Sequence, residues 1–242
     1  MINTVGIIGY GKLGGFLHEL GNRFFPDIEI RVHSRRHESD GETFFDLQTT
    51  AQSDLIFLCA NIDEYQERLV ATLKHAPPDT IFVDVAAVKV HTSELCRKYC
   101  EGRRYLSTHP LFGPDSYKKY QNNIDGFQIV VTDYALKNDT YQMIKAKFSA
   151  LGFSIVEMTA DEHDRELAET LFLTHYIGEA ITKTGFSETE LKSLSFKYLM
   201  DAVESVKGDK ELFKNIYRFN PHCKEVIQKF KQAQVEIEKE LQ

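Results

Sequence analysis

One histidine of this chain stands in a sequence context that suits proton transfer. His109 lies between a short apolar strand and a loop stiffened by two prolines, in the run Thr108-His109-Pro110-Leu111-Phe112-Gly113-Pro114. Proline fixes its own φ angle and favours extended geometry in the residue before it, which excludes His109 from a helix. Because the ordinary pKa of histidine lies near neutrality, this position suits a general acid or base. A lone loop histidine is more often a hydrogen-bonding residue, so the rest of the chain decides between the two roles.

A glycine-rich turn near the N-terminus has the spacing of a dinucleotide-binding site. An apolar strand expected at 4–8 runs into Gly9-Tyr10-Gly11-Lys12-Leu13-Gly14, and apolar residues at helical spacing follow. In this pattern Gly9 permits the tight turn, Gly11 lets the backbone approach a diphosphate, and Gly14 lets the helix pack on the strand. The first N–H groups of the helix would face the phosphates. We therefore predict that the whole run, Gly9, Tyr10, Gly11, Lys12, Leu13 and Gly14, binds the cofactor.

The end of the second strand carries basic residues where NAD-dependent enzymes usually carry an acid. The strand expected at 28–32 leads into His33-Ser34-Arg35-Arg36, about twenty residues beyond the last glycine of the turn. The Ser34 hydroxyl and the guanidinium groups of Arg35 and Arg36 suit a ribose 2′-phosphate. A solvated basic patch at a strand end is the alternative interpretation. The pattern favours NADP over NAD as the cofactor.

Further apolar runs predict an α/β fold. Strands are expected at 54–60, 80–85, 126–132 and 153–158, and helices at 63–74 and 140–151. Continuous apolar strands fill parallel sheets that are covered on both faces, so we predict a Rossmann-type doubly wound sheet over residues 1–158. Ligands bind beyond the carboxyl ends of such strands. Ala60, Asn61, Ala86 and Lys89 follow strand ends, as His109 does, and are expected near the nicotinamide.

The remaining residues, 159–242, are expected to form a smaller all-helical domain. Spacings of three and four place His175 on a small, mostly apolar stripe with Ala168, Leu171, Gly178 and Thr182. A core role and a ligand-contacting role for His175 stay equally open. A helical domain of this size buries its apolar residues poorly by itself, so we expect it to dock on the sheet domain and to form a homodimer.

Composition narrows the function classes. The 242 residues carry a formal charge of −7, and the basic residues are local, which argues against nucleic acid as a partner. The start of the chain leads directly into a strand, and no apolar run is long enough to cross a bilayer, so a cytoplasmic protein without membrane contact is expected. Cys59, Cys96, Cys100 and Cys223 lack paired spacing, which favours free thiols over a metal site or disulfides.

Taken together, the motifs resemble the prephenate and arogenate dehydrogenases of tyrosine biosynthesis over nearly the whole chain. The resemblance rests on GYGKLG, VDVAAVK, STHPLFGPDS, the Glu162-His163-Asp164 run with Ala168, and LTHYIG around His175. The plant-type NADP-dependent arogenate dehydrogenases also share the HSR ending of the second strand and the VEM run. Of these motifs, HPxFGP is the most specific.

The resemblance implies a reaction and roles for particular residues. The substrate is arogenate or prephenate, a small molecule whose ring bears a hydroxyl and a carboxylate. His109 accepts the hydroxyl proton while hydride passes to NADP and carbon dioxide departs. His175 lines the substrate pocket from the helical domain. Lys89, Ser107 and Thr108 are weaker candidates for contacts with substrate or cofactor.

The chain departs from the family pattern at two positions. Ala87 replaces a serine whose hydroxyl supports the catalytic histidine, a loss of about 1–3 kcal/mol of transition-state stabilisation. Glu204 stands where bacterial prephenate-type members carry an arginine for the ring carboxylate. Plant-type members also lack that arginine, so the resemblance favours arogenate as substrate.

Three alternatives stay open. Prephenate is the alternative substrate, and a catalytically impaired NADP-binding relative is the reading that Ala87 supports. A reductase of imines or hydroxy acids would explain the glycine turn but gives no reason for HPLFGP. We expect no regulatory extension after the helical region, so feedback by tyrosine is expected to act at or near the active site.

Overall fold

The computed structural model describes residues 2–187, 189–191 and 193–242. Internal contacts divide the chain into an N-terminal unit, residues 1–160, and a C-terminal unit, residues 161–242. The division falls two residues beyond the boundary expected from the sequence.

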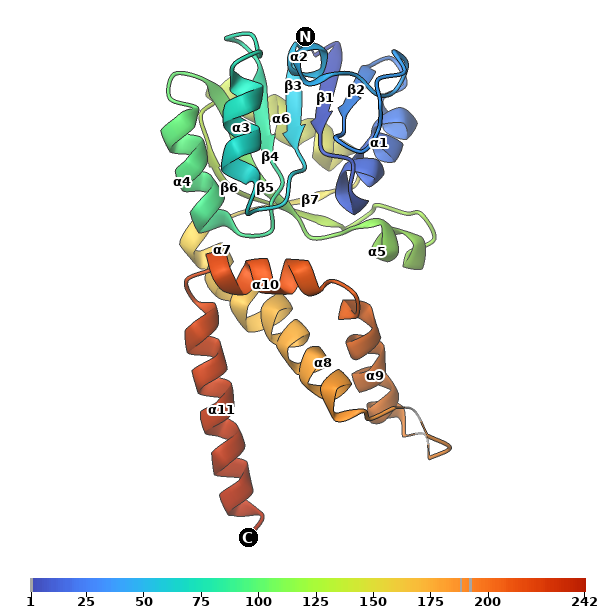
Figure 1. The fold of residues 1–242 in the computed structure, drawn as a ribbon, viewed down its shortest axis with the longest axis vertical. Helices are drawn as coiled ribbons and strands as arrows, with labels where there is room; N and C mark the ends of the chain where they lie inside the picture. The colour runs from blue at the N-terminus through green and yellow to red at the C-terminus, as the bar shows by residue number, and fades with distance from the viewer. Residues whose placement is uncertain (1, 188, 192) are drawn as a thin grey trace. The chain divides into compact units, whose positions relative to one another are not determined.

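The N-terminal unit is built on one sheet, whose strands are ordered β2-β1-β3-β4-β5-β6-β7 (Figure 1). The strands are β1 (Thr4–Ile8), β2 (Glu29–His33), β3 (Leu55–Leu58), β4 (Ile81–Asp84), β5 (Arg104–Pro110), β6 (Gln128–Tyr134) and β7 (Ser154–Glu157). Neighbouring strands run parallel except β5 and β6. The predicted α/β fold with a Rossmann-type sheet is therefore confirmed, and its last two strands, β6 and β7, run opposite to the other five.

Helices cover both faces of this sheet, as its continuous apolar strands require. They are α1 (Lys12–Phe24), α2 (Leu47–Ala51), α3 (Tyr65–Leu73), α4 (Lys89–Tyr99), α5 (Pro114–Lys119) and α6 (Asn138–Ala150). In β3, Ile56 and Leu58 pack toward α3 and α4, while Leu55 and Phe57 pack toward α1 and α6. The strands and helices predicted from the sequence all occur, with ends displaced by no more than two residues.

The strand order creates a divergence beside β1. The chain leaves β1 for β2 on one side and returns to β3 on the other, so the connections from these strands leave in opposite directions. In open α/β sheets a crevice forms at such a point, beyond the carboxyl ends of the strands. The turn after β1 and the residues after β3 lie there, joined by a bond from the Cys59 N–H to the Ile8 carbonyl at 2.8 Å.

The placement of His109 differs from the sequence expectation. His109 lies inside β5, opposite Val130 of β6, and not beyond the end of the strand. Parallel pairing with β4 stops at Ser107, where a bulge shifts the register, and the antiparallel β6 continues the ladder to Pro110. Because β6 is contributed by a segment some twenty residues later, local sequence around the prolines did not indicate this extension.

The C-terminal unit is all-helical, as predicted. It comprises α7 (Ala160–Leu167), a π-helical turn η1 (Ala168–Phe172), α8 (Leu173–Thr184), α9 (Leu194–Val206), α10 (Lys210–Phe219) and α11 (Cys223–Glu240). Helices α8 and α9 pack closely at Gly178, since a Cβ there would lie 2.6 Å from Val206 Cγ2. The buried Asn220 side chain donates to the Asp164 carbonyl at 2.7 Å and ties the end of α10 to α7.

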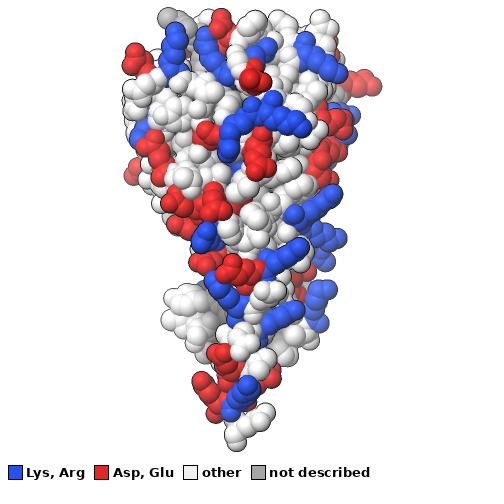
Figure 2. Space-filling view, turned by 90° about the vertical axis from the view of Figure 1, so that its left-hand side faces the viewer, with Lys and Arg blue, Asp and Glu red and all other residues white. Residues whose placement is uncertain are grey.

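The surface is mixed in charge. Lys and Arg side chains are interspersed with Asp and Glu on the face drawn in Figure 2. Among the residues that the structure describes, no helix combines the length and apolarity needed to cross a membrane.

Candidate active site

The glycine turn after β1 is tightly packed on two sides and open on the third. Gly9 has a φ of +107°, and a Cβ on it would lie 2.4 Å from the Cys59 carbonyl oxygen. A Cβ on Gly14 would lie 2.0 Å from the Gly9 carbonyl oxygen, whereas a Cβ on Gly11 would meet no atom within 4 Å. Gly9 and Gly14 are thus required by packing, and Gly11 leaves the backbone accessible to a ligand.

This geometry fits a diphosphate. Helix α1 begins at Lys12 with Gly11 as N-cap, no side chain caps it, and its first turn holds no acidic residue. The positive end of the helix dipole therefore faces the open side of the turn. Tyr10 and Lys12 lie at the turn, Tyr10 half-buried and Lys12 exposed, while the half-buried Leu13 also contributes to the core.

The predicted 2′-phosphate residues follow β2 on the same edge of the sheet. Ser34 is nearly buried, and its hydroxyl accepts from the Arg36 N–H at 3.2 Å. The guanidinium of Arg35 contacts Glu64, the N-cap of α3, through Nη2 at 2.8 Å and 2.5 Å from the two carboxylate oxygens. This contact holds the pKa of Glu64 below its usual range. Arg36 is exposed.

Sequence reasoning missed two residues of this cluster, His37 and Glu64. His37 Nδ1 lies 3.0 Å from the Ser34 hydroxyl, and its ring stacks on Phe44 with centroids 4.4 Å apart. Tyr10 meets both rings edge-on. His37 could have been found, because it directly continues the Ser34-Arg35-Arg36 run; Glu64 could not, because it is 29 residues from Arg35.

The residues expected near the nicotinamide lie at the ends of β3 and β4. Ala60 is half-buried and Asn61 exposed, directly after β3. The Ala86 N–H donates to Asp84 Oδ1 at 2.9 Å, which folds the loop back over the end of β4. Burial, with Asp84 nearby, raises the pKa of the Cys59 thiol to about 12, so this thiol is neutral.

A buried network centred on Asp84 lies beneath the same edge. Asp84 Oδ2 accepts from Lys89 Nζ and from the Thr92 hydroxyl, each at 2.6 Å, and from the Ser107 hydroxyl at 2.9 Å. The Thr108 hydroxyl donates to the Asp84 carbonyl at 2.7 Å. Asp84 and Lys89 are almost fully buried, at 1% and 0% exposure, so the charges of this pair compensate each other away from water.

The network supports the strand that carries His109. Lys89 Nζ donates not only to Asp84 but also, at 2.6 Å, to the carbonyl of Thr108, the residue directly before His109. His109 itself is 8% exposed. Lys89, Ser107 and Thr108 thus direct their polar groups toward Asp84 and the backbone of β5, and their direct contact with a ligand stays a prediction.

His175 belongs to the C-terminal unit. It is 2% exposed on α8, and its ring stacks on Phe213 of α10 with centroids 6.0 Å apart. Burial lowers the pKa of His175, against the opposing influence of Asp209 and Glu179, which favours the neutral imidazole near pH 7. Ala168 and Gly178 of the predicted stripe are buried as well.

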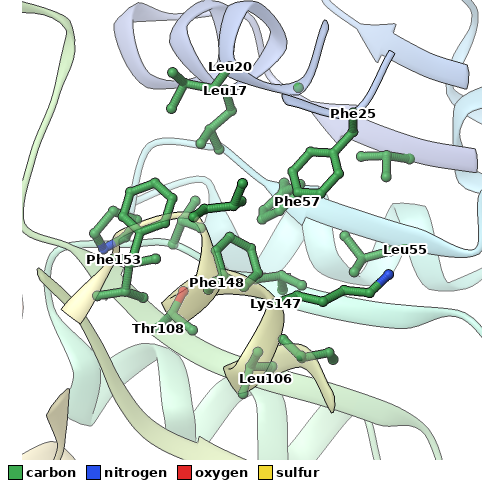
Figure 3. Close-up of a pocket in the computed structure, with 18 of the residues that line it drawn as sticks. Leu17, Leu20, Phe25, Leu55, Phe57, Leu106, Thr108, Lys147, Phe148 and Phe153 are labelled. Atoms are coloured by element: carbon green, nitrogen blue, oxygen red, sulfur yellow. The ribbon is translucent and has the colours of Figure 1, made fainter. Parts of the chain in front are cut away.

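A separate cavity of about 200 Å³ lies between the sheet, α1 and α6 (Figure 3). Leu17, Phe57, Leu106 and Phe148 are among the apolar side chains that line it, and Thr108 is one of its few polar neighbours. A nucleotide or a carboxylate-bearing ring needs several polar partners, which this lining does not offer. The lining of this cavity therefore does not fit either ligand.

Comparison with known proteins identifies relatives of the chain. A family model described as prephenate dehydrogenase, nucleotide-binding domain, matches residues 36–148, which include Asp84, Lys89 and His109. Arogenate dehydrogenase 2, chloroplastic, of Arabidopsis thaliana is 28% identical over 250 residues, which cover 98% of this chain and 69% of that protein.

Two solved structures share the fold. The prephenate dehydrogenase of A. aeolicus in complex with hydroxyphenyl propionate and NAD+ is similar with a TM-score of 0.75 at 16% identity, covering 99% of this chain and 90% of that one. Synechocystis arogenate dehydrogenase has a TM-score of 0.69 at 20% identity, covering 96% of this chain and 90% of that one.

The nucleotide-binding domain and its strand order place the chain among the NAD(P)-dependent dehydrogenases. Within that class, residues 36–148 match the nucleotide-binding domain of the prephenate dehydrogenases, and the chain is similar to prephenate and arogenate dehydrogenases over nearly its whole length. The resemblance seen in the motifs is thereby confirmed, and with it a link to tyrosine biosynthesis.

Proposed function

We propose that this protein is an NADP-dependent arogenate dehydrogenase that oxidatively decarboxylates arogenate to tyrosine. The observation that carries the proposal is His109, set in β5 beside the sheet's ligand edge and immediately after a carbonyl that the buried Lys89 anchors. The plant-type motifs and the similarity to an Arabidopsis arogenate dehydrogenase support arogenate over prephenate as the substrate.

His109 is the proton acceptor in this proposal. When bound, the nicotinamide dinucleotide supplies the acceptor for the hydride that leaves the ring carbon bearing the hydroxyl. His109 takes the hydroxyl proton as the carbon–oxygen double bond forms. Loss of carbon dioxide then leaves the bonding pair in the ring, which becomes aromatic, and the oxygen recovers a proton. The aromatic product makes the reaction effectively irreversible, so the protein chiefly orients the ring and holds one base.

The cofactor is held by residues of the N-terminal unit. The open side of the turn at Gly11 and the first turn of α1 bind the diphosphate, with Tyr10, Lys12 and Leu13 alongside. Ser34, Arg35 and Arg36 bind the 2′-phosphate, which is the basis for NADP over NAD. Ala60, Asn61 and Ala86 border the nicotinamide end.

Lys89 and Ser107 serve as positioning residues for His109. Their hydrogen bonds to Asp84 and to the Thr108 carbonyl fix the backbone of β5 at the bulge next to the imidazole. His175 is proposed as a substrate contact, and its neutral ring can donate one hydrogen bond and accept another.

The test is the initial rate of NADP+ and NAD+ reduction with arogenate and prephenate offered separately. Turnover with arogenate and NADP+ is expected, and His109→Asn should reduce kcat about 10²- to 10⁴-fold while NADP+ binding is unchanged. Turnover with prephenate but not with arogenate would show that prephenate is the substrate. No turnover with either, despite tight NADP+ binding, would support the impaired-relative alternative.

A substitution at Ala87 tests directly whether the protein is a catalytically impaired relative. If the family serine supports the catalytic histidine, Ala87→Ser should raise kcat about tenfold, since one such hydrogen bond contributes about 1–3 kcal/mol. Lys98→Ser, on the exposed surface of α4, is a control that leaves kcat unchanged.

Assembly and location complete the proposal. Three large apolar side chains on α9, Leu194, Tyr198 and Leu199, are exposed by 65%, 63% and 41%, which supports a homodimer formed through the helical unit. Sedimentation equilibrium of the protein and of Tyr198→Asp would test it. A cytoplasmic location stays a prediction, because the Arabidopsis relative is named as chloroplastic.

A further inference from the structure

The proposed 2′-phosphate ligand Arg35 already has an anionic partner. Its Nη2 lies 2.8 Å from Oε1 and 2.5 Å from Oε2 of Glu64, so one guanidinium nitrogen meets both carboxylate oxygens. The pair joins the segment after β2 to the start of α3, two elements that follow the strands flanking β1. A phosphate that binds Arg35 must therefore approach, or displace, the Glu64 carboxylate.

The pair lies where a ligand can reach it. The Arg35 side chain is 60% exposed and that of Glu64 is 34% exposed. Exposed ion pairs are weak, because water solvates both partners well and the long side chains lose freedom when they pair. A phosphate carrying close to two negative charges is a stronger partner for a guanidinium than a single carboxylate.

A second cation, Arg68, can remain paired with Glu64 when Arg35 binds a phosphate. Arg68 Nε lies 3.5 Å from Glu64 Oε2, one helical turn along α3, and Arg68 Nη2 lies 3.3 Å from Glu67. When Arg35 turns to a phosphate, Glu64 keeps Arg68 as a partner. Its carboxylate then stays close to Arg35 and continues to repel the phosphate.

We propose that Glu64 is a specificity-determining residue of the cofactor site, which competes with the 2′-phosphate for Arg35 and thereby limits the preference for NADP over NAD. This inference rests on the proposed role of Arg35 in binding that phosphate. NAD carries an uncharged hydroxyl at the same position, so Glu64 does not lower the affinity for NAD to a comparable extent.

The test is calorimetric titration of NADP+ and NAD+ into the protein and four variants, in the absence of substrate. Glu64→Gln should bind NADP+ about fivefold more tightly and NAD+ within about twofold of the unchanged protein. Arg35→Gln should weaken NADP+ binding alone. In Arg35→Gln/Glu64→Gln the effect of the Glu64 change should vanish, since it acts through Arg35.

Glu67→Gln is the matched control. It removes the same charge close by, but Glu67 forms its ion pair with Arg68 and influences Arg35 less than Glu64 does, so NADP+ affinity should change less than twofold.

Distinct results separate this inference from the proposed function. If Arg35→Gln weakens NADP+ binding but Glu64→Gln has no effect, or has the same effect without Arg35, the role of Glu64 is overturned and the NADP proposal stands. If the unchanged protein binds NAD+ as tightly as NADP+ and Arg35→Gln alters neither, the NADP proposal itself is wrong.

Discussion

Two ion pairs at the ligand edge of the same sheet have almost identical shortest N–O distances and opposite surroundings. Lys89 Nζ lies 2.6 Å from Asp84 Oδ2, and Arg35 Nη2 lies 2.5 Å from Glu64 Oε2. The first pair has no exposed side-chain surface, whereas Arg35 is 60% exposed. Judged by distance alone, the two ion pairs would be equally strong.

The difference in burial distinguishes the roles that we propose for the two pairs. The Asp84 carboxylate also accepts from Thr92 and Ser107, so the buried pair is part of a larger hydrogen-bonded network. Such a network fixes the backbone next to His109. The exposed pair can exchange its partner for a phosphate, which a specificity residue requires and a positioning residue must avoid.

The largest expected effect is the loss of stability when the cation of the buried pair is removed. Lys89→Met should reduce the free energy of unfolding by about 3–5 kcal/mol, because it leaves the Asp84 charge buried without compensation. Arg35→Met, the exposed counterpart, should leave that free energy almost unchanged. Urea denaturation followed by circular dichroism measures both. Equal losses in the two variants would contradict the distinction.

A smaller effect is expected from a single hydrogen bond to the buried carboxylate. Thr92→Val keeps the shape of the side chain but removes the hydroxyl that donates to Asp84 at 2.6 Å. We expect a loss of about 1.5–3 kcal/mol, the range for hydrogen bonds to charged groups. Thr170→Val is the control, because its exposed hydroxyl bonds only a helix carbonyl. A loss at Thr92 no greater than at Thr170 would show that the network adds little.

The smallest expected effect is the pH dependence of the exposed pair. Arg35 holds the pKa of Glu64 below its ordinary value of 4.5, so the unfolded chain binds this proton at a higher pH than the folded one. The stability that the pair adds is complete above pH 4.5 and is lost as the pH falls through the folded pKa. The stability difference between the unchanged protein and Glu64→Gln should therefore shrink between pH 6 and pH 3. A difference independent of pH would mean that the pair does not form in solution.

Local patterns predicted the elements well and the polar partners poorly. The glycine turn, the strands and the helical unit were predicted because each depends on residue types at short spacing. His109 was expected beyond a strand end but lies within β5, since its pairing with Val130 depends on a distant segment. A ligand contact of Lys89 stays a prediction, and its hydrogen bonds to Asp84 and to the Thr108 carbonyl were not indicated by any local pattern.

The sequence by itself determined the α/β fold, the glycine turn that fits a diphosphate, the candidate base His109 and, through its motifs, the family. The fold and the turn follow from backbone preferences and apolar periodicity, which act over a few residues, whereas the family follows from the resemblance of the motifs. Only the tertiary structure decided that Lys89 supports β5 and that Glu64 holds Arg35. Residues 19 and 29 positions apart meet in these contacts, so strand register and helix placement select the partners, and no local pattern encodes that choice.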